Sequence, residues 1–420
     1  MLDGTNPADS YRLLSGRLAA IAASAPLTLC GMSACVDARI LLAGASALID
    51  PGAPDDAAAF GAMLKDRARR GVGGEVRVDW PDGPAWLAAH VPATYALGGV
   101  GPQAAWVLST LGAPALVNLE DRSRHMLDRL PPAILVAEDG RAVRADALTE
   151  RGARRPDIYI FEYQAGVAIG DVVPTRSSRI IVRFYDPGLE HDGAFDALSL
   201  HGAATAGAGL VAGFNAVPEG DLDAETTRVF AMTRAWAAAG LDTVHHELSG
   251  YDHPSLRDRV LAAGRGAVTS LGMSHSEFLD LSPEARDPAG MFSALRALGE
   301  RLSLDRVCIH ADDWAASVTR RDPETEEQAL MAGCLVAATR AATGRPARPD
   351  GLPEGARFAP LPFGARAGEG GWHFVAVPSP YLERPATTLG LGDTFTAGCL
   401  LVLGATGRLA STGEVRRAAV

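Results

Sequence analysis

The chain has 420 residues, of which 47% are hydrophobic and 21% charged, and it carries a formal net charge of −11. This length allows a large core and a second lobe, and the composition is that of an ordinary soluble globular protein. The acidic balance argues against a nucleic-acid-binding surface, and no apolar run approaches the roughly 18 residues of a membrane span.

The cysteines form neither a CxxC pair nor a disulfide pattern, and the N-terminus lacks the basic stretch of a signal peptide. We therefore expect a cytoplasmic protein, either a monomer or a small homo-oligomer, with no nucleic-acid or membrane partner. Lys65 is the only lysine in the sequence. Any phosphate-binding clamp in this chain is therefore expected to be built from arginine.

Helices and strands are predicted in alternation along most of the chain. Residues 7–24 predict a helix, and residues 27–36 predict a strand that leads to Asp37. Further strands are expected at 210–214, 243–247, 267–270 and 306–310, and further helices at 221–239, 253–263, 288–303 and 325–343. This alternation predicts an α/β fold with a large, mostly parallel sheet flanked by helices on both faces.

Two stretches interrupt the alternation. Residues 40–95 are rich in Gly and Asp, and residues 155–195 contain two strand-like runs with no helix between them. We expect these two stretches to form one small, β-rich lid. The expected division is a large nucleotide-binding domain from 1–39, 96–154 and 196–420, and a discontinuous lid from 40–95 and 155–195. Residues 343–370 predict a loop.

The segment 387–398 reads TTLGLGDTFTAG and precedes an apolar run. Gly390 and Gly392 suit a tight turn that opens a helix, because glycine lets the backbone approach a ligand closely. The free N–H groups at the start of such a helix bind an anion. Asp393 lies at this anion hole and could accept the proton of a hydroxyl that attacks phosphorus. The segment therefore predicts a small-molecule kinase; the alternative is that Asp393 is a structural N-cap.

Two glutamates are expected at the carboxyl ends of consecutive strands, where open α/β sheets bind ligands. Glu247 ends the run HHE, and Glu277 follows the next predicted strand. Carboxylates in such places can hold a hydrated Mg²⁺ that bridges to phosphates. We therefore predict that Glu247 and Glu277 bind Mg²⁺. The alternative is that Glu277 only caps the helix that follows it.

Taken in order, motifs between about residues 27 and 405 resemble the ADP-dependent glucokinase/phosphofructokinase family of the ribokinase-like superfamily, as a divergent bacterial-type member. The motifs are MSACVD at 32–37, GVGGE at 71–75, LGG at 97–99, FEY at 161–163, SRII at 178–181, AGFN at 212–215, VHHE at 244–247, GMSHSE at 272–277 and GLGDT at 390–394. The resemblance implies a ribokinase-like fold with a smaller β-rich lid.

The resemblance also implies roles for residues on the acceptor side. Asp37 would bind sugar hydroxyls. Glu75 stands at the position of the glutamate that marks the glucokinase type and would contact the sugar. Gly98 and Gly99 would form the sugar-side loop. Arg179, in the lid segment, would contact the phosphates of the nucleotide and assist catalysis.

On the nucleotide side, the resemblance implies that Thr388, Gly390, Leu391 and Gly392 bind the nucleotide. Gly390 and Gly392 would also stabilise the transferring group, and Asp393 would be the catalytic base. The metal implied is Mg²⁺, held near the HxE and NxxE motifs.

The chain departs from the family patterns mainly on the acceptor side. Ser33 and Cys35 replace two asparagines of the first motif, Pro102 alters the sugar-side loop, and Ser274 replaces the asparagine of NxxE. We therefore predict the transfer of a phosphoryl group from a nucleotide to a hydroxyl of a non-phosphorylated sugar or sugar-like polyol. ADP is the expected donor, ahead of ATP. The alternatives are an ATP-dependent ribokinase-type sugar or nucleoside kinase and a non-catalytic regulator that binds sugar or nucleotide.

Overall fold

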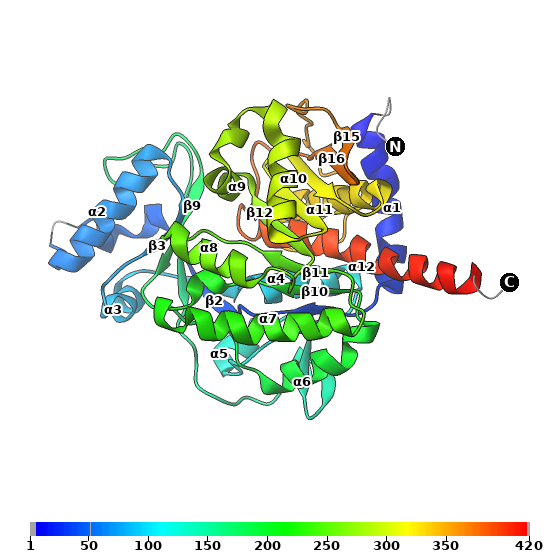
Figure 1. The fold of residues 1–420 in the computed structure, drawn as a ribbon. Helices are drawn as coiled ribbons and strands as arrows, with labels where there is room; N and C mark the ends of the chain where they lie inside the picture. Colours follow the sequence, from blue (N-terminus) through cyan, green and yellow to red (C-terminus); the bar gives the residue numbers. More distant parts are fainter. Residues whose placement is uncertain (1–5, 51, 418–420) are drawn as a thin grey trace.

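The computed structural model describes residues 6–50 and 52–417, and it contains two β-sheets of unequal size (Figure 1). The large sheet has eleven strands in the order β15-β16-β14-β13-β12-β11-β10-β1-β5-β6-β7, and the small sheet has five in the order β3-β9-β8-β2-β4. In Figure 1 the small sheet and helices α2 and α3 form a separate lobe on the left.

The large sheet is parallel from β13 to β6 and antiparallel at both edges. Its strands are β1 (Thr28–Cys30), β5 (Ala115–Val117), β6 (Leu135–Glu138), β7 (Arg141–Arg144), β10 (Ala208–Val211), β11 (Val244–Glu247), β12 (Ser270–Ser274), β13 (Arg306–His310), β14 (Trp314–Thr319), β15 (Arg366–Glu369) and β16 (Trp372–Pro378). Parallel strands place their carboxyl ends at one edge of the sheet, and the candidate site lies there.

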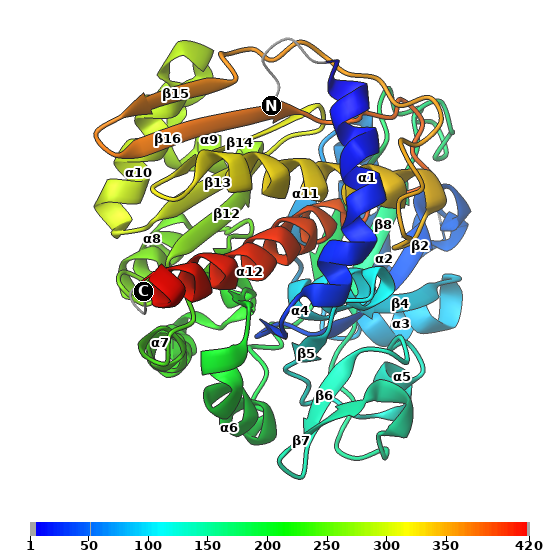
Figure 2. The same cartoon turned by 90° about the vertical axis from the view of Figure 1, so that its right-hand side faces the viewer.

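Helices cover both faces of the large sheet, which explains why its strands are apolar on both sides. One face carries α1 (Pro7–Ser24), α4 (Val100–Leu111), α11 (Pro323–Thr343) and α12 (Leu391–Arg417); Figure 2 shows α1, α11 and α12 lying across it. The other face carries α6 (Gly193–Gly202), α7 (Leu222–Ala238), α8 (Pro254–Ala263), α9 (His275–Leu281) and α10 (Met291–Leu302). Neighbouring residues of β1 divide between the two cores, Leu29 in one and Cys30 in the other.

The small sheet packs one face against two helices. Its strands are β2 (Cys35–Leu41), β3 (Gly74–Arg77), β4 (Thr94–Gly98), β8 (Ile158–Tyr163) and β9 (Ser178–Arg183), and its helices are α2 (Asp55–Arg70) and α3 (Gly83–His90). A core that includes Phe60, Leu64, Trp80 and Phe161 fills the space between them. A further short helix, α5 (Arg124–Leu127), follows β5 of the large sheet.

Several sequence-based expectations need correction. The single strand expected at 27–36 is wrong, because β1 ends at Cys30 in the large sheet and β2 begins at Cys35 in the small one. Asp37 consequently lies in the small sheet, although we expected it in the main one. The strand expected at 267–270 begins only at Ser270.

The segment 40–95 is also less β-rich than expected, because α2 and α3 fill a large part of it. Strands β2 and β4 cross the expected domain boundaries after residues 39 and 95, so the small sheet takes more of the chain than the predicted lid. The physical reason for the strand errors is that the consecutive short strands β1 and β2 read as one apolar run, and only their pairing assigns each of them to a sheet.

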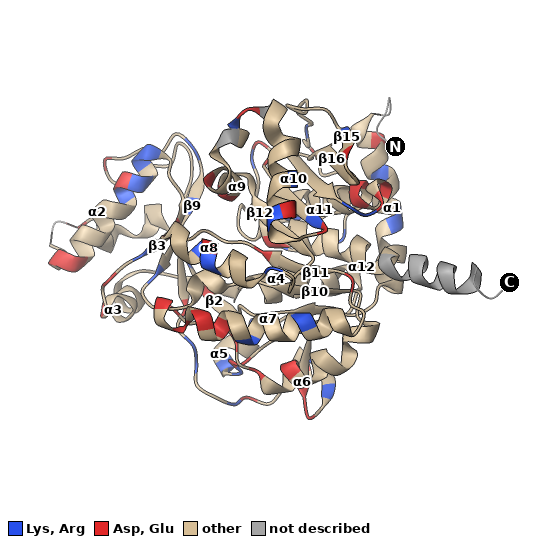
Figure 3. Ribbon diagram, viewed as in Figure 1, with Lys and Arg blue, Asp and Glu red and all other residues tan. Residues whose placement is uncertain are grey.

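Positions of positively and negatively charged residues are interspersed along the outer helices in the ribbon of Figure 3, most visibly on α2. Within the described residues, no helix has the length and apolar character needed to cross a bilayer.

Candidate active site

The turn before α12 has the conformation that the sequence predicts. Gly390 adopts a left-handed backbone with φ of 67°, which glycine permits at no steric cost. The helix begins at Leu391, and the first helical hydrogen bond runs from the Thr394 N–H to the Gly390 carbonyl (3.1 Å). The N–H groups of the first helical turn precede this bond, so they have no helical acceptor and face the carboxyl edge of the sheet.

Asp393 lies in this first turn of α12, and its side chain is half-buried. Within the described part of the chain, its carboxylate makes no hydrogen bond and no ion pair. Burial raises the pKa of Asp393, while the nearby charges of Arg340 and Arg179 lower it and that of Glu247 raises it. An unpaired carboxylate among arginines can accept the proton of a hydroxyl, which is the chemistry expected of a general base. The capping alternative fails for Asp393, because no backbone N–H donates to it.

Arg340, on α11, is the main charge next to this turn, and sequence analysis missed it. A Cβ built on Gly390 would lie 2.5 Å from Nη2 of Arg340. Nη1 of Arg340 donates to Oε1 of Gln103 (2.8 Å) and to Oγ1 of Thr394 (2.9 Å). The sequence contained one signal for Arg340: it is an arginine inside the apolar run of a predicted helix. Charged residues are rarely buried in such a run unless they are paired or have a function.

Arg179 reaches the site from the small sheet, on β9. Its half-buried guanidinium is close enough to lower the pKa of Asp393. Its buried Nε has no hydrogen-bond partner in the structure. Leu389, next to the turn, packs against Ile158 and Ile160 of β8. The small sheet therefore covers the glycine turn and brings an arginine over it.

Glu247 is buried at the end of β11 and is held by three side chains. Its Oε2 is hydrogen-bonded to His245 Nε2 (2.9 Å) and Thr396 Oγ1 (3.0 Å), and its Oε1 lies 3.6 Å from His310 Nε2. Burial alone would raise the pKa of Glu247, but the two histidines lower it to about 2. His310, at the end of β13, was not singled out from the sequence; it also lies 3.2 Å from the position of a Cβ on Gly392.

Glu277 forms a capping box at the start of α9. Its Oε2 accepts from the Ser274 N–H (2.7 Å) and from Ser274 Oγ (2.8 Å), and Ser274 Oγ accepts from the Glu277 N–H (3.3 Å). Burial raises the pKa of Glu277, and the charge of Glu247 raises it further. The capping role is therefore present, and Oε1 is left for other contacts.

These two carboxylates fit a hydrated magnesium ion but not a closed protein cage. Within the described residues, no group of three or more His, Cys, Asp or Glu side chains could enclose a metal. Mg²⁺ commonly keeps several waters and takes only one or two carboxylates together with substrate phosphates. The oxygen donors of Glu247, at the end of β11, and Glu277, in the first turn of α9, suit that mode.

On the acceptor side, Asp37 lies between β4 and β8 in the small sheet and is buried. A Cβ on Gly98 would collide with its carboxylate, and a Cβ on Gly99 would collide with the Ser33 backbone. The glycines thus allow the loop to close on Asp37. Burial, together with the charge of Asp393, raises the pKa of Asp37 to about 7, against the lowering effect of a hydrogen bond from Cys35.

Glu75, on β3, is held by groups from both sheets. Arg183 Nε of β9 donates to its Oε1, and Asn215 Nδ2, from the 3₁₀ turn Phe214–Ala216 after β10, donates to its Oε2 (3.1 Å). Arg183 also acts on Asp37, lowering the pKa of that carboxyl. The structure therefore brings Glu75, Arg183 and Asp37 to one region, and the charge of Asp393 reaches the same region.

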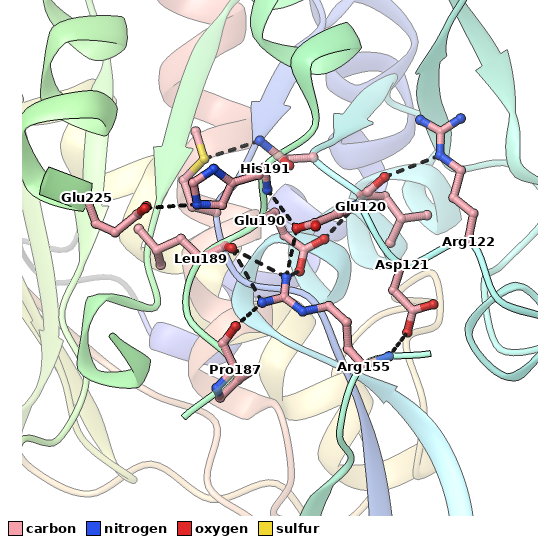
Figure 4. Close-up of polar contacts among 12 residues, drawn as sticks. Glu120, Asp121, Arg122, Arg155, Pro187, Leu189, Glu190, His191 and Glu225 are labelled. Atoms are coloured by element: carbon pink, nitrogen blue, oxygen red, sulfur yellow. Dashed lines mark hydrogen bonds and ion pairs between the residues drawn. The ribbon is translucent and has the colours of Figure 1, made fainter. Parts of the chain in front are cut away.

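A second polar cluster lies where the chain passes between the two sheets (Figure 4). Arg155 precedes β8, and it ion-pairs with Glu190, a fully buried residue that follows β9. Arg155 also donates to the carbonyl oxygens of Pro187 and Leu189, and the Glu120 N–H donates to Glu190 Oε2 (2.6 Å). One arginine therefore ties both ends of the β8–β9 segment to the large sheet.

Fold and site together define a class: an α/β enzyme with an anion-binding helix terminus, an available carboxylate at that terminus and an arginine from a second sheet, as phosphoryl transfer requires. The family model of the ADP-specific phosphofructokinase/glucokinase conserved region matches residues 55–358, well over half of the chain. The chain therefore belongs to this family. It is a nucleotide-dependent sugar kinase, a phosphotransferase with an alcohol group as acceptor, and the recognition made from its sequence motifs is confirmed.

Solved structures support the fold. An ADP-dependent kinase in complex with fructose-6-phosphate and ADPβS superposes with a TM-score of 0.79 at 17% identity, covering 96% of this chain and 99% of that one. The last common ancestor of ADP-dependent phosphofructokinases from Methanosarcinales gives 0.72 at 18% identity, covering 94% and 98%. A hypothetical ADP-dependent phosphofructokinase from Pyrococcus horikoshii OT3 gives 0.72 at 18%, covering 91% and 98%. No curated protein sequence matches the chain. The expected α/β fold, with a large, mostly parallel sheet flanked by helices and a smaller β-sheet, is confirmed.

Proposed function

We propose that this enzyme transfers a phosphoryl group from ADP to a hydroxyl of a non-phosphorylated sugar or sugar-like polyol in the cytoplasm, with Asp393 as the base. The observation that carries the proposal is the half-buried Asp393 carboxylate, which lies at the N-terminus of α12 and has no intramolecular partner in the described chain. A protein that only binds its ligand has no need of a free carboxylate beside a phosphate site.

In this proposal each group has one task. Asp393 removes the proton as the acceptor hydroxyl attacks in line. The N–H groups from Gly390 to Asp393 stabilise the charge of the transferring group, since fixed dipoles act strongly where water is excluded. Arg179 binds the nucleotide phosphates, and Thr388 and Leu391 line the nucleotide. The small sheet, by its contact with Leu389, excludes water that would hydrolyse the donor.

Mg²⁺ belongs to the proposal as a partner of the nucleotide. Glu247 and Glu277 would hold it, in part through water, and the ion would neutralise phosphate charge. Glu247 is suited to this because His245 and His310 keep it ionised. Glu277 would use the oxygen that its capping box leaves free.

The acceptor class follows from the charges in the cleft. Asp37 and Glu75 offer hydrogen-bond acceptors to hydroxyls, beside the Gly98–Gly99 loop. Arg183 pairs with Glu75, so its charge is neutralised. A phosphate group already present on the acceptor would be repelled by these two carboxylates. We therefore propose an unphosphorylated acceptor. Two alternatives remain. An ATP-dependent kinase would differ in the phosphoryl donor, and a regulator that binds its ligand without turnover would not be an enzyme.

A transfer assay separates these three possibilities. The purified protein is incubated with Mg²⁺, with ADP or ATP, and with a panel of sugars, cyclitols and nucleosides, and phosphorylated products are followed by mass shift. We expect more product with ADP than with ATP, and for Asp393→Asn a rate that is lower by roughly 10²–10⁴. Asp223→Asn, which removes an exposed carboxylate from the first turn of α7, is the matched control. Asp393→Asn activity within about threefold of wild type would remove Asp393 from the mechanism.

A further inference from the structure

Arg340 is a buried cation without a carboxylate partner. Its side chain is only 4% exposed, and within the described chain it makes no ion pair; its two hydrogen bonds go to the neutral oxygens of Gln103 and Thr394. Its Nε is buried and has no hydrogen-bond partner. The ring of Trp106 lies 5.8 Å from its guanidinium carbon. Buried charges in proteins are normally paired, so this arrangement calls for a reason.

The position of Arg340 makes the arrangement less favourable still. Its guanidinium packs against Gly390, immediately before the first residue of α12. A helix N-terminus carries the positive end of the helix dipole, where a cation is disfavoured. Two positive features therefore face the same turn. Both of these positive features can stabilise the same negative groups: the carboxylate of Asp393 and the anion that the turn is suited to bind.

The charged and titratable groups that act on Asp393 come from five elements: Arg340 of α11, Arg179 of β9, Glu247 of β11, His310 of β13 and Asp37 of β2. Among the cations, Arg340 has the largest effect on the Asp393 carboxyl. It is also bonded to the turn itself, through Thr394, whose hydroxyl donates to the Gly390 carbonyl (2.6 Å). Arg179, by contrast, sits on the small sheet.

We propose that Arg340 is a positioning residue of the transfer reaction, which fixes the Gly390–Thr394 turn and holds a positive charge beside the Asp393 carboxylate independently of Arg179 on the small sheet. This rests on the proposed role of Asp393 as the base. Arg340 acts on the reacting hydroxyl only through Asp393 and through the N–H groups of the turn.

The direct test is the titration of Asp393 in the ligand-free protein. Aspartate carboxyl carbons are labelled with ¹³C, and the Asp393 signal is assigned from its loss in Asp393→Asn. Arg340→Met fills the same space without charge, Arg340→Gln keeps hydrogen-bonding capacity without charge, and Arg340→Lys keeps the charge. We expect the Asp393 pKa to rise by about one unit or more in the Met and Gln variants. In Arg340→Lys and in the exposed control Arg345→Gln it should stay within about half a unit of wild type.

Stability and rate provide a second readout that a merely structural arginine would not give. Replacing a buried, poorly paired charge by a hydrophobic side chain is often neutral or stabilising, so Arg340→Met should keep or raise the Tm while kcat falls at least tenfold. Part of that loss should be recovered as the pH is raised, because Asp393 then ionises without help. Asp393→Asn should show no such recovery.

An Asp393 pKa that shifts by less than about half a unit in both neutral variants overturns the inference, as does a large drop in Tm with kcat unchanged. If Arg340→Met does not fold, the titration and pH profile of Arg340→Gln decide. A different result would contradict the proposed function itself, namely full activity of Asp393→Asn.

Discussion

Nδ2 of Asn215, in the 3₁₀ turn Phe214–Ala216 that follows β10 of the large sheet, lies 3.1 Å from Oε2 of Glu75, on the edge strand of the small sheet. The same carboxylate pairs with Arg183. Glu75 therefore joins the small sheet to the segment after β10 and also neutralises Arg183, whose charge acts on Asp37. This double role yields a prediction about which acceptors the enzyme accepts.

Glu75→Ala should shift the preference toward phosphorylated acceptors. In wild type, Glu75 repels a phosphate and occupies Arg183; without it, the freed guanidinium can bind a phosphate through two donors. We expect kcat/KM for an unphosphorylated sugar to exceed that for its phosphate ester in wild type, and the ratio to fall at least tenfold in the variant. Glu354→Ala, at an exposed position, is the control. A wild type that prefers the ester would reverse the assignment and favour a phosphofructokinase-like role.

Arg179→Lys should impair the reaction although the charge is conserved. A guanidinium binds phosphate through two parallel donors, and an ammonium group cannot. We expect the KM for ADP to rise and kcat to fall, each by about three- to tenfold. Arg176→Lys, on the exposed connection before β9, should leave both unchanged. Unaltered constants in Arg179→Lys would mean that this side chain does not reach the phosphates.

The acceptor KM should depend on pH through Asp37. Burial raises the pKa of Asp37 to about 7, so below that pH the protonated carboxyl loses an acceptor that the sugar hydroxyls need. A buried hydroxyl left without its partner costs about 1–3 kcal/mol, and the KM should therefore fall roughly tenfold as the pH rises through about 7. Asp37→Asn should have a raised, pH-independent KM. A flat KM in wild type would contradict the role of Asp37.

The stability of the fold should also respond to pH, through Glu190. Burial raises the pKa of Glu190 from 4.5 to about 7, although Arg155 lowers it. The folded chain therefore binds this proton more tightly than the unfolded chain, and the free energy of unfolding should fall as the pH rises from about 4.5 to 7. Glu190→Gln should flatten this dependence in denaturant titrations. Glu120→Gln, in the same cluster but partly exposed, is the control; parallel curves for Glu190→Gln and wild type would contradict the prediction.

The strongest local pattern of the sequence was the glycine turn, and the structure bears out its geometry. Gly390, Gly392, Asp393 and the apolar run after them lie in one short segment. The turn, the start of the helix and the position of the carboxylate can therefore be predicted from local sequence alone. The same holds for the strand–helix alternation and for Glu277, whose capping box involves only neighbours along the chain. Patterns of this kind need no knowledge of distant segments.

Only the tertiary structure decided which residues share the site. Arg340 is 50 residues before the turn that it touches. Its place inside an apolar helix did not show which distant segment its side chain would contact. The assignment of Asp37 to the small sheet depended on pairing with β4 and β8, because both halves of the 27–36 run are equally apolar. The sequence by itself therefore determined the chemistry of the turn, whereas the fold decided which charges surround it, since Coulomb forces act through space and not along the chain.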